Sequence, residues 1–162
     1  MLKYLFYQVY TKEIPDEISL GFSITGCPIH CPECHSPHTW DKDLGDELTT
    51  DEVIKAIDKQ RYITNLLFFG GEWEHEYLGI VINSVKTYFL NDLKVSLYTG
   101  HKLNEIQKYD SLYKQLAYLK VGEYNSRLGG LDYPTTNQRL YKMGNGEVIE
   151  DITYKFWKTN IR

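Results

Sequence analysis

The three cysteines of the chain, Cys27, Cys31 and Cys34, fall within eight residues in a C-x3-C-x2-C pattern. Thiolates at such short spacings allow one loop to wrap around a compact inorganic centre. Pro28 and Pro32 keep the intervening backbone from forming a regular helix. An odd, tightly clustered set of cysteines argues against a secreted disulfide framework, and it favours a reducing compartment in which thiols bind a metal or do chemistry.

Three cysteine ligands are one fewer than a cluster of four irons and four sulfides (4Fe-4S) takes when cysteine alone holds it. If the centre is such a cluster, one iron is open to a substrate, because catalytic metal sites keep an open position. We therefore interpret Cys27, Cys31 and Cys34 as candidate cluster ligands.

Other interpretations of the cysteines remain open. A Cys3His zinc site could use His30, His35 or His38, and residues 31–35 match the C-x-x-C-H pattern of covalent haem attachment. Haem attachment would be expected with an export signal, but residues 1–17 indicate a strand and not a signal peptide. Structural zinc is least needed where a chain has its own core. Three unrelated buried cysteines are disfavoured by their clustering with prolines and histidines.

Composition predicts one globular domain over residues 1–162. The chain is 42% hydrophobic, and 18 Lys and Arg against 22 Asp and Glu give a net charge of −4. A chain of this length buries about two thirds of its unfolded surface, so a core forms without staples. No basic block suits nucleic acid, and no apolar stretch approaches the roughly 18 residues of a membrane span. We expect a cytoplasmic protein with neither nucleic acid nor membrane as a partner.

Hydrophobic periodicity predicts alternating strands and helices, typical of an α/β fold with a parallel sheet. The sheet is expected to be open or bent into a short partial (β/α) barrel. Thr49 and Glu52 are placed as a capping box at one helix start, and Asn145-Gly146 indicates a C-terminal hairpin. The expected strands span 4–10, 18–24, 65–69, 93–98 and 117–121; helical stretches begin at 49, 74 and 101, the last two ending near 89 and 116; an edge or capping segment spans 152–157.

Ligands of parallel α/β sheets collect at the carboxyl ends of the strands. The cysteine loop follows one expected strand there, and Gly70-Gly71-Glu72 follows the next. A glycine pair permits close backbone approach to a ligand, although a plain strand-to-helix turn would also use it. His75 and His101 begin expected helices and are interpreted as solvated.

Three segments together carry a family resemblance: Gly26-Cys27-x3-Cys31-Pro32-x-Cys34-His35-x3-Thr39-Trp40-Asp41, Phe69-Gly70-Gly71-Glu72, and residues 134–141 (PTTNQRLY). They resemble the activating enzymes of anaerobic (class III) ribonucleotide reductase, a branch of the radical S-adenosylmethionine superfamily. The cysteine signature alone indicates the superfamily, and the Trp40 context with the late Asn-Gln-Arg segment indicates the branch. The chain departs from the common pattern at Glu33, where most of the superfamily has an aromatic residue, and at residues 13–17, where many activases carry Asp-Gly-Pro-Gly.

The resemblance implies an activase that reductively cleaves S-adenosylmethionine to a 5′-deoxyadenosyl radical and generates a glycyl radical on the catalytic subunit of anaerobic ribonucleoside-triphosphate reductase. It implies a 4Fe-4S cluster, S-adenosylmethionine and a reduced electron donor such as flavodoxin or ferredoxin. No residue beyond the cluster and cofactor is expected to be catalytic. In such a protein Gly70, Gly71 and Glu72 receive the methionine amino group, and residues 33–35 (Glu33, Cys34 and His35) contact the adenosyl group.

The polar residues Asn137, Gln138 and Arg139 lie between the parallel core and the expected hairpin. We hypothesise that they line the opening of the site and position the partner's glycine loop, with Arg139 as a fixed charge. Alternatively, this loop's side chains bond to their own backbone. Two further functions stay open: a non-enzymatic zinc or iron-sulfur module, and a radical S-adenosylmethionine enzyme with a small-molecule substrate, which the short chain disfavours.

Overall fold

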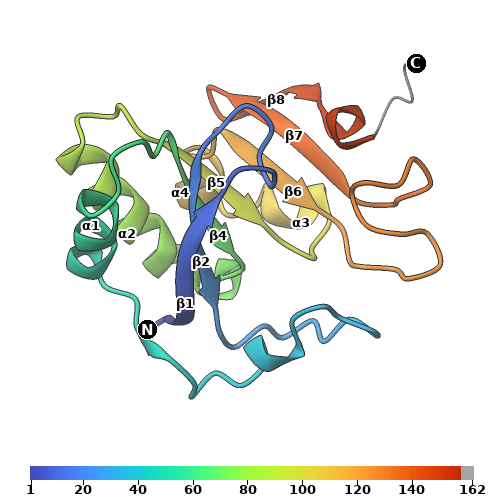
Figure 1. The fold of residues 1–162 in the computed structure, drawn as a ribbon, viewed down its shortest axis with the longest axis horizontal. Helices are drawn as coiled ribbons and strands as arrows, with labels where there is room; N and C mark the ends of the chain where they lie inside the picture. The colour runs from blue at the N-terminus through green and yellow to red at the C-terminus, as the bar shows by residue number, and fades with distance from the viewer. Residues whose placement is uncertain (158–162) are drawn as a thin grey trace.

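A computed structural model describes residues 1–157. Eight strands form one open sheet in the order β3-β1-β2-β4-β5-β6-β7-β8 (Figure 1). The central strands β2, β4, β5 and β6 are parallel, whereas the pairs at both edges are antiparallel. The predicted α/β fold is confirmed, as a mixed sheet that does not close into a barrel. The strands span Lys3–Tyr10 (β1), Ser19–Ile24 (β2), Asp46–Glu47 (β3), Asn65–Phe69 (β4), Lys94–Tyr98 (β5), Tyr118–Val121 (β6), Arg139–Gly144 (β7) and Glu147–Asp151 (β8).

The central strands are apolar because both faces of the sheet are covered. One face packs on α1 (Thr50–Asp58) and α2 (His75–Tyr88), which lie side by side in Figure 1. Phe22 and Phe68 on the sheet and Leu78 on α2 are fully buried in this main core. Thr49 caps α1, since its side chain accepts a hydrogen bond from the Glu52 N–H at 3.2 Å, which is one half of the predicted capping box.

The helical stretch predicted over 101–116 is instead two four-residue helices, α3 (Leu103–Ile106) and α4 (Asp110–Tyr113). Ile106 and Leu112 are both completely buried. Six positions apart on one straight helix, they would point about 120° away from each other. The break at Tyr109, where ψ is 65°, lets both side chains reach the core. Tertiary packing therefore overrides the helical pattern here.

A smaller core on the other face includes Ile14, Leu67 and Ile152. It is covered by the β1–β2 connection and by a short 3-10 helix, Thr153–Phe156, inside the predicted capping segment. The predicted hairpin is present as β7 and β8, joined at Asn145 and Gly146, which both have positive φ. No helix in residues 1–157 is long and apolar enough to cross a membrane.

The connections that follow the central strands meet at one end of the sheet, where parallel strands present their carboxyl termini. The connection after β2 carries the cysteines and runs along the lower edge of Figure 1, in light blue. It faces the connection between β6 and β7, residues 122–138, through a ring contact between His35 and Tyr124 with centroids 4.4 Å apart. Together these connections surround the candidate site.

Candidate metal centre

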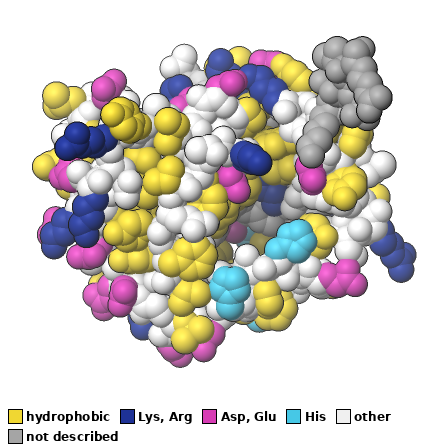
Figure 2. Space-filling model, viewed as in Figure 1, with side chains coloured by type: hydrophobic (Ala, Val, Ile, Leu, Met, Phe, Trp, Pro, Cys, Tyr) yellow, Lys and Arg dark blue, Asp and Glu magenta, His cyan; other side chains and the backbone are white. Residues whose placement is uncertain are grey.

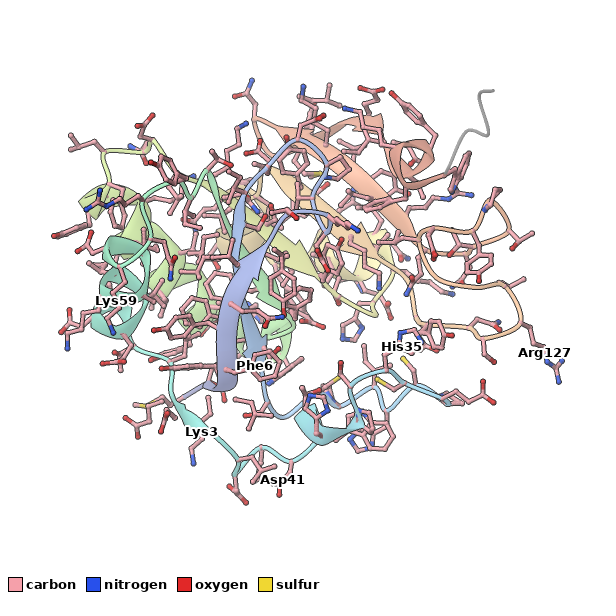
Figure 3. The ribbon with its side chains drawn as sticks, viewed as in Figure 1. Lys3, Phe6, His35, Asp41, Lys59 and Arg127 are labelled. Atoms are coloured by element: carbon pink, nitrogen blue, oxygen red, sulfur yellow. The ribbon has the colours of Figure 1, made fainter. Side chains whose placement is uncertain are left out.

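A cavity of about 480 Å³ opens at the carboxyl end of the central strands. Cys27, Cys31 and Cys34 all line it, so the fold brings together the three predicted ligands. Figure 2 shows this hollow with histidines at its rim, and Figure 3 shows His35 between the two connections. The cavity wall also includes Gly70, Glu72, Thr99, Lys120, Gln138 and several aromatic rings.

The base of the cysteine loop is closed by the backbone. The N–H groups of Gly26 and Cys27 both donate to the Thr39 carbonyl, at 2.7 and 3.3 Å. Gly26 has φ +92°, a conformation that glycine adopts without strain. This closure makes residues 27–38 a loop anchored on the end of β2.

A tight turn joins the last two cysteines. The Cys34 N–H donates to the Cys31 carbonyl at 3.1 Å, with Pro32 and Glu33 as the central residues. Pro32 suits the first central position and Glu33, at φ +57°, takes the left-handed second position of a type II turn. The C-x-x-C spacing therefore places the two thiols on one turn.

Hydrogen bonds and burial act on the cysteine sulfurs. The Ser36 N–H donates to Cys34 Sγ at 3.3 Å, as donors do around sulfur ligands of iron clusters. Burial raises the pKa of the Cys27 thiol, and backbone N–H groups of Ile29 and His30 oppose that rise. A bound cation that favours thiolate would therefore find the Cys34 sulfur already hydrogen-bonded.

Lys120 on β6 is a functional candidate that the sequence interpretation missed. Its side chain is buried beside the cavity, and its Nζ donates to the carbonyls of Thr99 (3.2 Å) and Gly122 (2.8 Å). Burial lowers its pKa to about 8, while the three cysteines and Glu72 act in the opposite direction. The signal in the sequence is a lone lysine inside the apolar run of residues 118–121.

Glu72, which the sequence did single out, is buried in the same wall. Its Oε1 accepts a hydrogen bond from Thr99 Oγ1 at 2.7 Å, whereas its Oε2 has no hydrogen-bond partner. Burial raises the pKa of this carboxyl, with Thr99, His101 and Lys120 opposing. A buried polar atom without a partner calls for a ligand group or ion at that point. The carboxylate and the Lys120 ammonium give the cavity one acceptor and one donor of opposite charge.

The histidines of the cysteine loop each lie against an aromatic ring. His30 stacks on Trp40, His35 contacts Tyr124 and His38 stacks on Phe6. Within residues 1–157, no three Cys, His, Asp or Glu side chains stand close enough to hold a single metal ion. Thiols spread around a shared cavity suit a larger iron-sulfur centre, whose several irons separate its ligands.

The remaining predicted contacts are divided between the cavity and its surroundings. His35 lines the cavity, whereas exposed Glu33 lines a separate groove beside residues 122–138. Gln138 is buried in the cavity wall, and its side chain donates to the Gly122 carbonyl at 3.3 Å. Arg139 begins β7 and lies in an outer groove, with Nε 3.9 Å from Asp151. Asn137 donates to the Glu123 carbonyl, so the side chains of 137 and 138 do bond to nearby backbone.

The two glycines after β4 face different surroundings. Gly70 lines the cavity, and a Cβ there would meet the Trp73 ring at 2.7 Å. Gly71, at φ +105°, would direct a Cβ into the core, 3.2 Å from Leu78 and 3.3 Å from Leu2. A side chain at position 71 would therefore enter the core and not the cavity, while backbone contact from Gly71 to a ligand stays a prediction.

Gly71→Val is accordingly expected to destabilise the fold by about 2–4 kcal/mol, because it combines backbone strain with overpacking. Urea unfolding of the cluster-free chain measures this change. Gly130→Val is the matched control, since a Cβ there meets only the Asp132 carboxylate at 3.5 Å. A Gly71→Val protein of unchanged stability with weakened cofactor binding would return this position to the cavity.

The family model described as a 4Fe-4S single cluster domain matches residues 18–140. The match runs from β2 through the cysteine loop, Glu72 and Lys120 to the first residues of β7, and it covers well over half of the chain. No curated protein sequence matches the chain. The fold, the shared cavity of the three thiols and this match lead to one conclusion: the chain belongs to the 4Fe-4S single cluster domain family.

Proposed function

We propose that the protein is a radical S-adenosylmethionine activase that installs a glycyl radical on anaerobic ribonucleoside-triphosphate reductase, using electrons from reduced flavodoxin or ferredoxin. One observation carries the proposal. Three thiols, an unpartnered carboxylate and a buried ammonium line the same cavity. The family membership supports the cluster, and the resemblance of the motifs supports the finer assignment.

Cys27, Cys31 and Cys34 would hold the cluster, since thiolates are the usual ligands of such centres and the three line one cavity. When bound, the cluster supplies one electron that cleaves S-adenosylmethionine into methionine and a 5′-deoxyadenosyl radical. The loop itself fixes the ligands through its closed base at Thr39 and the turn at Pro32. A preformed loop lowers the ordering cost of cluster binding.

Glu72 and Lys120 suit the amino-acid end of the cofactor. An α-amino group can donate to the free Oε2 of Glu72, and an α-carboxylate can accept from the remaining proton of the Lys120 ammonium. Both protein groups are buried, so these charge-assisted hydrogen bonds would form away from bulk water. Glu72 and Lys120 together would therefore favour a ligand that carries both an ammonium and a carboxylate over a ligand with only one of these charges.

Aromatic rings in the cavity wall would surround the remainder of the bound S-adenosylmethionine and the target glycine. Phe69 packs against Tyr10 and Tyr98, with centroids 5.1 and 5.3 Å apart, and all three line the cavity. A Cβ on Gly21 would meet the Tyr10 ring at 2.6 Å, so this glycine makes room for the aromatic wall. Packed rings hold their positions and exclude water from the site.

The direct test is anaerobic reconstitution with iron and sulfide, followed by reduction with dithionite in the presence of S-adenosylmethionine. The proposal predicts 5′-deoxyadenosine in the reduced sample and a glycyl radical, seen by electron paramagnetic resonance, once the reductase is added. A cluster-loaded protein that forms no 5′-deoxyadenosine would be a non-enzymatic iron-sulfur module. Formation of 5′-deoxyadenosine without a glycyl radical would indicate another substrate.

Arg139 offers a test of partner positioning. It lies outside the cavity, beside the opening formed by residues 122–138. We expect Arg139→Ala to leave dithionite-driven formation of 5′-deoxyadenosine close to that of the wild type and to lower glycyl-radical yield on the order of tenfold, as loss of a charged contact does. Lys142→Ala, which removes an exposed cation from the same strand, is the matched control. Equal losses of both products would assign Arg139 to cofactor binding or folding.

A further inference from the structure

The wall behind Glu72 separates two spaces. Glu72 lines the cavity of the cysteines, whereas His101 lines an outer groove of about 870 Å³. Their side chains meet across this wall, with Nε2 of His101 3.8 Å from Oε1 of Glu72. Thr99 orients both residues: its hydroxyl donates to the Glu72 carboxylate and accepts the His101 backbone N–H at 3.0 Å.

The contact continues to the surface through Glu105 on α3. The His101 Nδ1 lies 3.5 Å from Glu105 Oε2, and that oxygen is held by the Lys102 backbone N–H at 2.7 Å. Side-chain exposure rises along the series, from 1% for Glu72 to 28% for His101 and 48% for Glu105. The three groups therefore form a carboxylate–imidazole–carboxylate series that leads from a buried wall to solvent.

When the α-amino group of an amino-acid ligand binds a metal, it loses a proton that has to leave the site. A free α-amino group has a pKa of about 7.7–8.0 and is largely protonated at neutral pH. Only its deprotonated form has a lone pair for a metal, so coordination releases one proton. The buried, unpartnered Oε2 of Glu72 is a basic atom of the cavity wall that can accept it.

We propose that Glu72, His101 and Glu105 conduct this proton from the cavity to solvent, with His101 as the proton carrier between the two carboxylates. The inference rests on the proposed function, because it takes S-adenosylmethionine as the amino-acid ligand. The ammonium gives one proton to Oε2 of Glu72, rotation of the carboxyl group presents that proton to Nε2 of His101, and His101 loses a proton from Nδ1 to Glu105 and water. One N–H bond breaks at the ligand, one proton reaches solvent, and no electron is transferred.

The distances and the neighbouring charges fit this route. Gaps of 3.5 and 3.8 Å exceed a hydrogen bond, and a ring rotation or one bridging water closes each. The charged or titratable groups that act on Glu72 are His101, Lys120 and Cys27. Lys120 donates to the carbonyls of two buried residues, Thr99 and Gly122, neither of which leads to the surface. His101 is the group that touches both Glu72 and an exposed carboxylate.

The experiment follows proton release directly. Cluster-loaded protein is mixed anaerobically with S-adenosylmethionine in weakly buffered solution containing a pH indicator, in a stopped-flow instrument. The wild type is expected to release about one proton per ligand bound near pH 7. His101→Ala is expected to release the same amount on the order of 100-fold more slowly, as loss of a positioned proton carrier does. Added imidazole, which can occupy the outer groove, is expected to restore the rate in this variant and not to accelerate the wild type.

Further variants separate the route from folding. His101→Gln keeps a polar side chain without a titratable group and is expected to show the same slow release, whether or not His101→Ala folds. Glu105→Gln, which neutralises the outer carboxylate of the route, is expected to slow proton release as well, and Glu76→Gln, which neutralises an exposed carboxylate on α2, is its control. Failure of the wild type to bind S-adenosylmethionine would refute the proposed function itself. Two results would refute the proton route alone, provided that S-adenosylmethionine binds normally. One is fast proton release in the His101 variants. The other is slow release in His101→Ala that added imidazole does not accelerate.

Discussion

Replacement of any one of Cys27, Cys31 and Cys34 by alanine is expected to abolish formation of 5′-deoxyadenosine and to prevent assembly of a stable 4Fe-4S cluster. The chain contains no fourth cysteine that could take over a lost position. Two remaining thiolates would leave two irons without protein ligands, and the cluster would be lost or degraded. Iron and sulfide content after anaerobic reconstitution, the visible absorption spectrum and the yield of 5′-deoxyadenosine measure the effect.

Asp43→Asn is a suitable control, because Asp43 lies between the cysteine loop and β3 with an exposed side chain. It should retain the cluster and the wild-type yield of 5′-deoxyadenosine. Full activity in any of the three cysteine variants would remove that residue from the ligand set. Stoichiometric zinc in protein reconstituted with iron would contradict the cluster itself.

The cysteine loop could be located from the sequence because its chemistry and its geometry are both local. Three thiols within one loop need no long-range contact to be recognised as a ligand set, and Pro32 at the first central position of the Cys31–Cys34 turn is a local signal as well. The same holds for Gly70, which directly follows an apolar strand. These features could be placed at one end of the sheet because parallel strands share their carboxyl edge.

Contacts between residues on different strands and helices could not be predicted from the sequence. Lys120 meets Thr99 through the pairing of β5 with β6, and that register is set by packing and not by either strand alone. His101 was interpreted as solvated because a histidine at a helix start usually is, yet it lies against Glu72. The direction of a Cβ at Gly71 likewise depends on its φ of +105°, which the sequence does not contain.

The buried ammonium of Lys120 offers the most informative single substitution. We expect Lys120→Met to retain the iron-sulfur cluster while lowering affinity for S-adenosylmethionine on the order of 10–100-fold, as loss of a charge-assisted hydrogen bond does. Equilibrium binding to the reconstituted protein measures the affinity, and the visible spectrum reports the cluster. Lys94→Met is the matched control, because Lys94 pairs with Glu17 and begins β5, at the opposite end of the strands from the cavity.

The same substitution has a distinct expected effect on stability. The pKa of Lys120 in the folded chain, about 8, lies below its ordinary value of 10.5. Between these two pH values the unfolded chain binds more protons, so the free energy of unfolding rises with pH across that window. The pKa difference corresponds to about 3 kcal/mol of unfolding free energy. Below pH 8 the folded chain carries this full cost of burying the charged ammonium, and above pH 10.5 the cost is absent. Lys120→Met removes the titrating group and should lack this rise.

Urea unfolding of the cluster-free wild type and Lys120→Met at several pH values between 7 and 10.5 measures this difference, and comparison of the two chains cancels the cysteine titration they share. Met is similar in length and apolar, so it fills the site but leaves the carbonyls of Thr99 and Gly122 without the ammonium, at a cost of about 1–3 kcal/mol. The burial cost that Met removes is of similar size, so stability near pH 7 should change little.

A variant that unfolds at pH 7 would make Lys120 a structural residue. A stable variant that binds S-adenosylmethionine as the wild type does would remove Lys120 from the cofactor site. Near-normal stability combined with lost affinity for S-adenosylmethionine is expected only if the Lys120 ammonium binds the ligand and does not stabilise the fold.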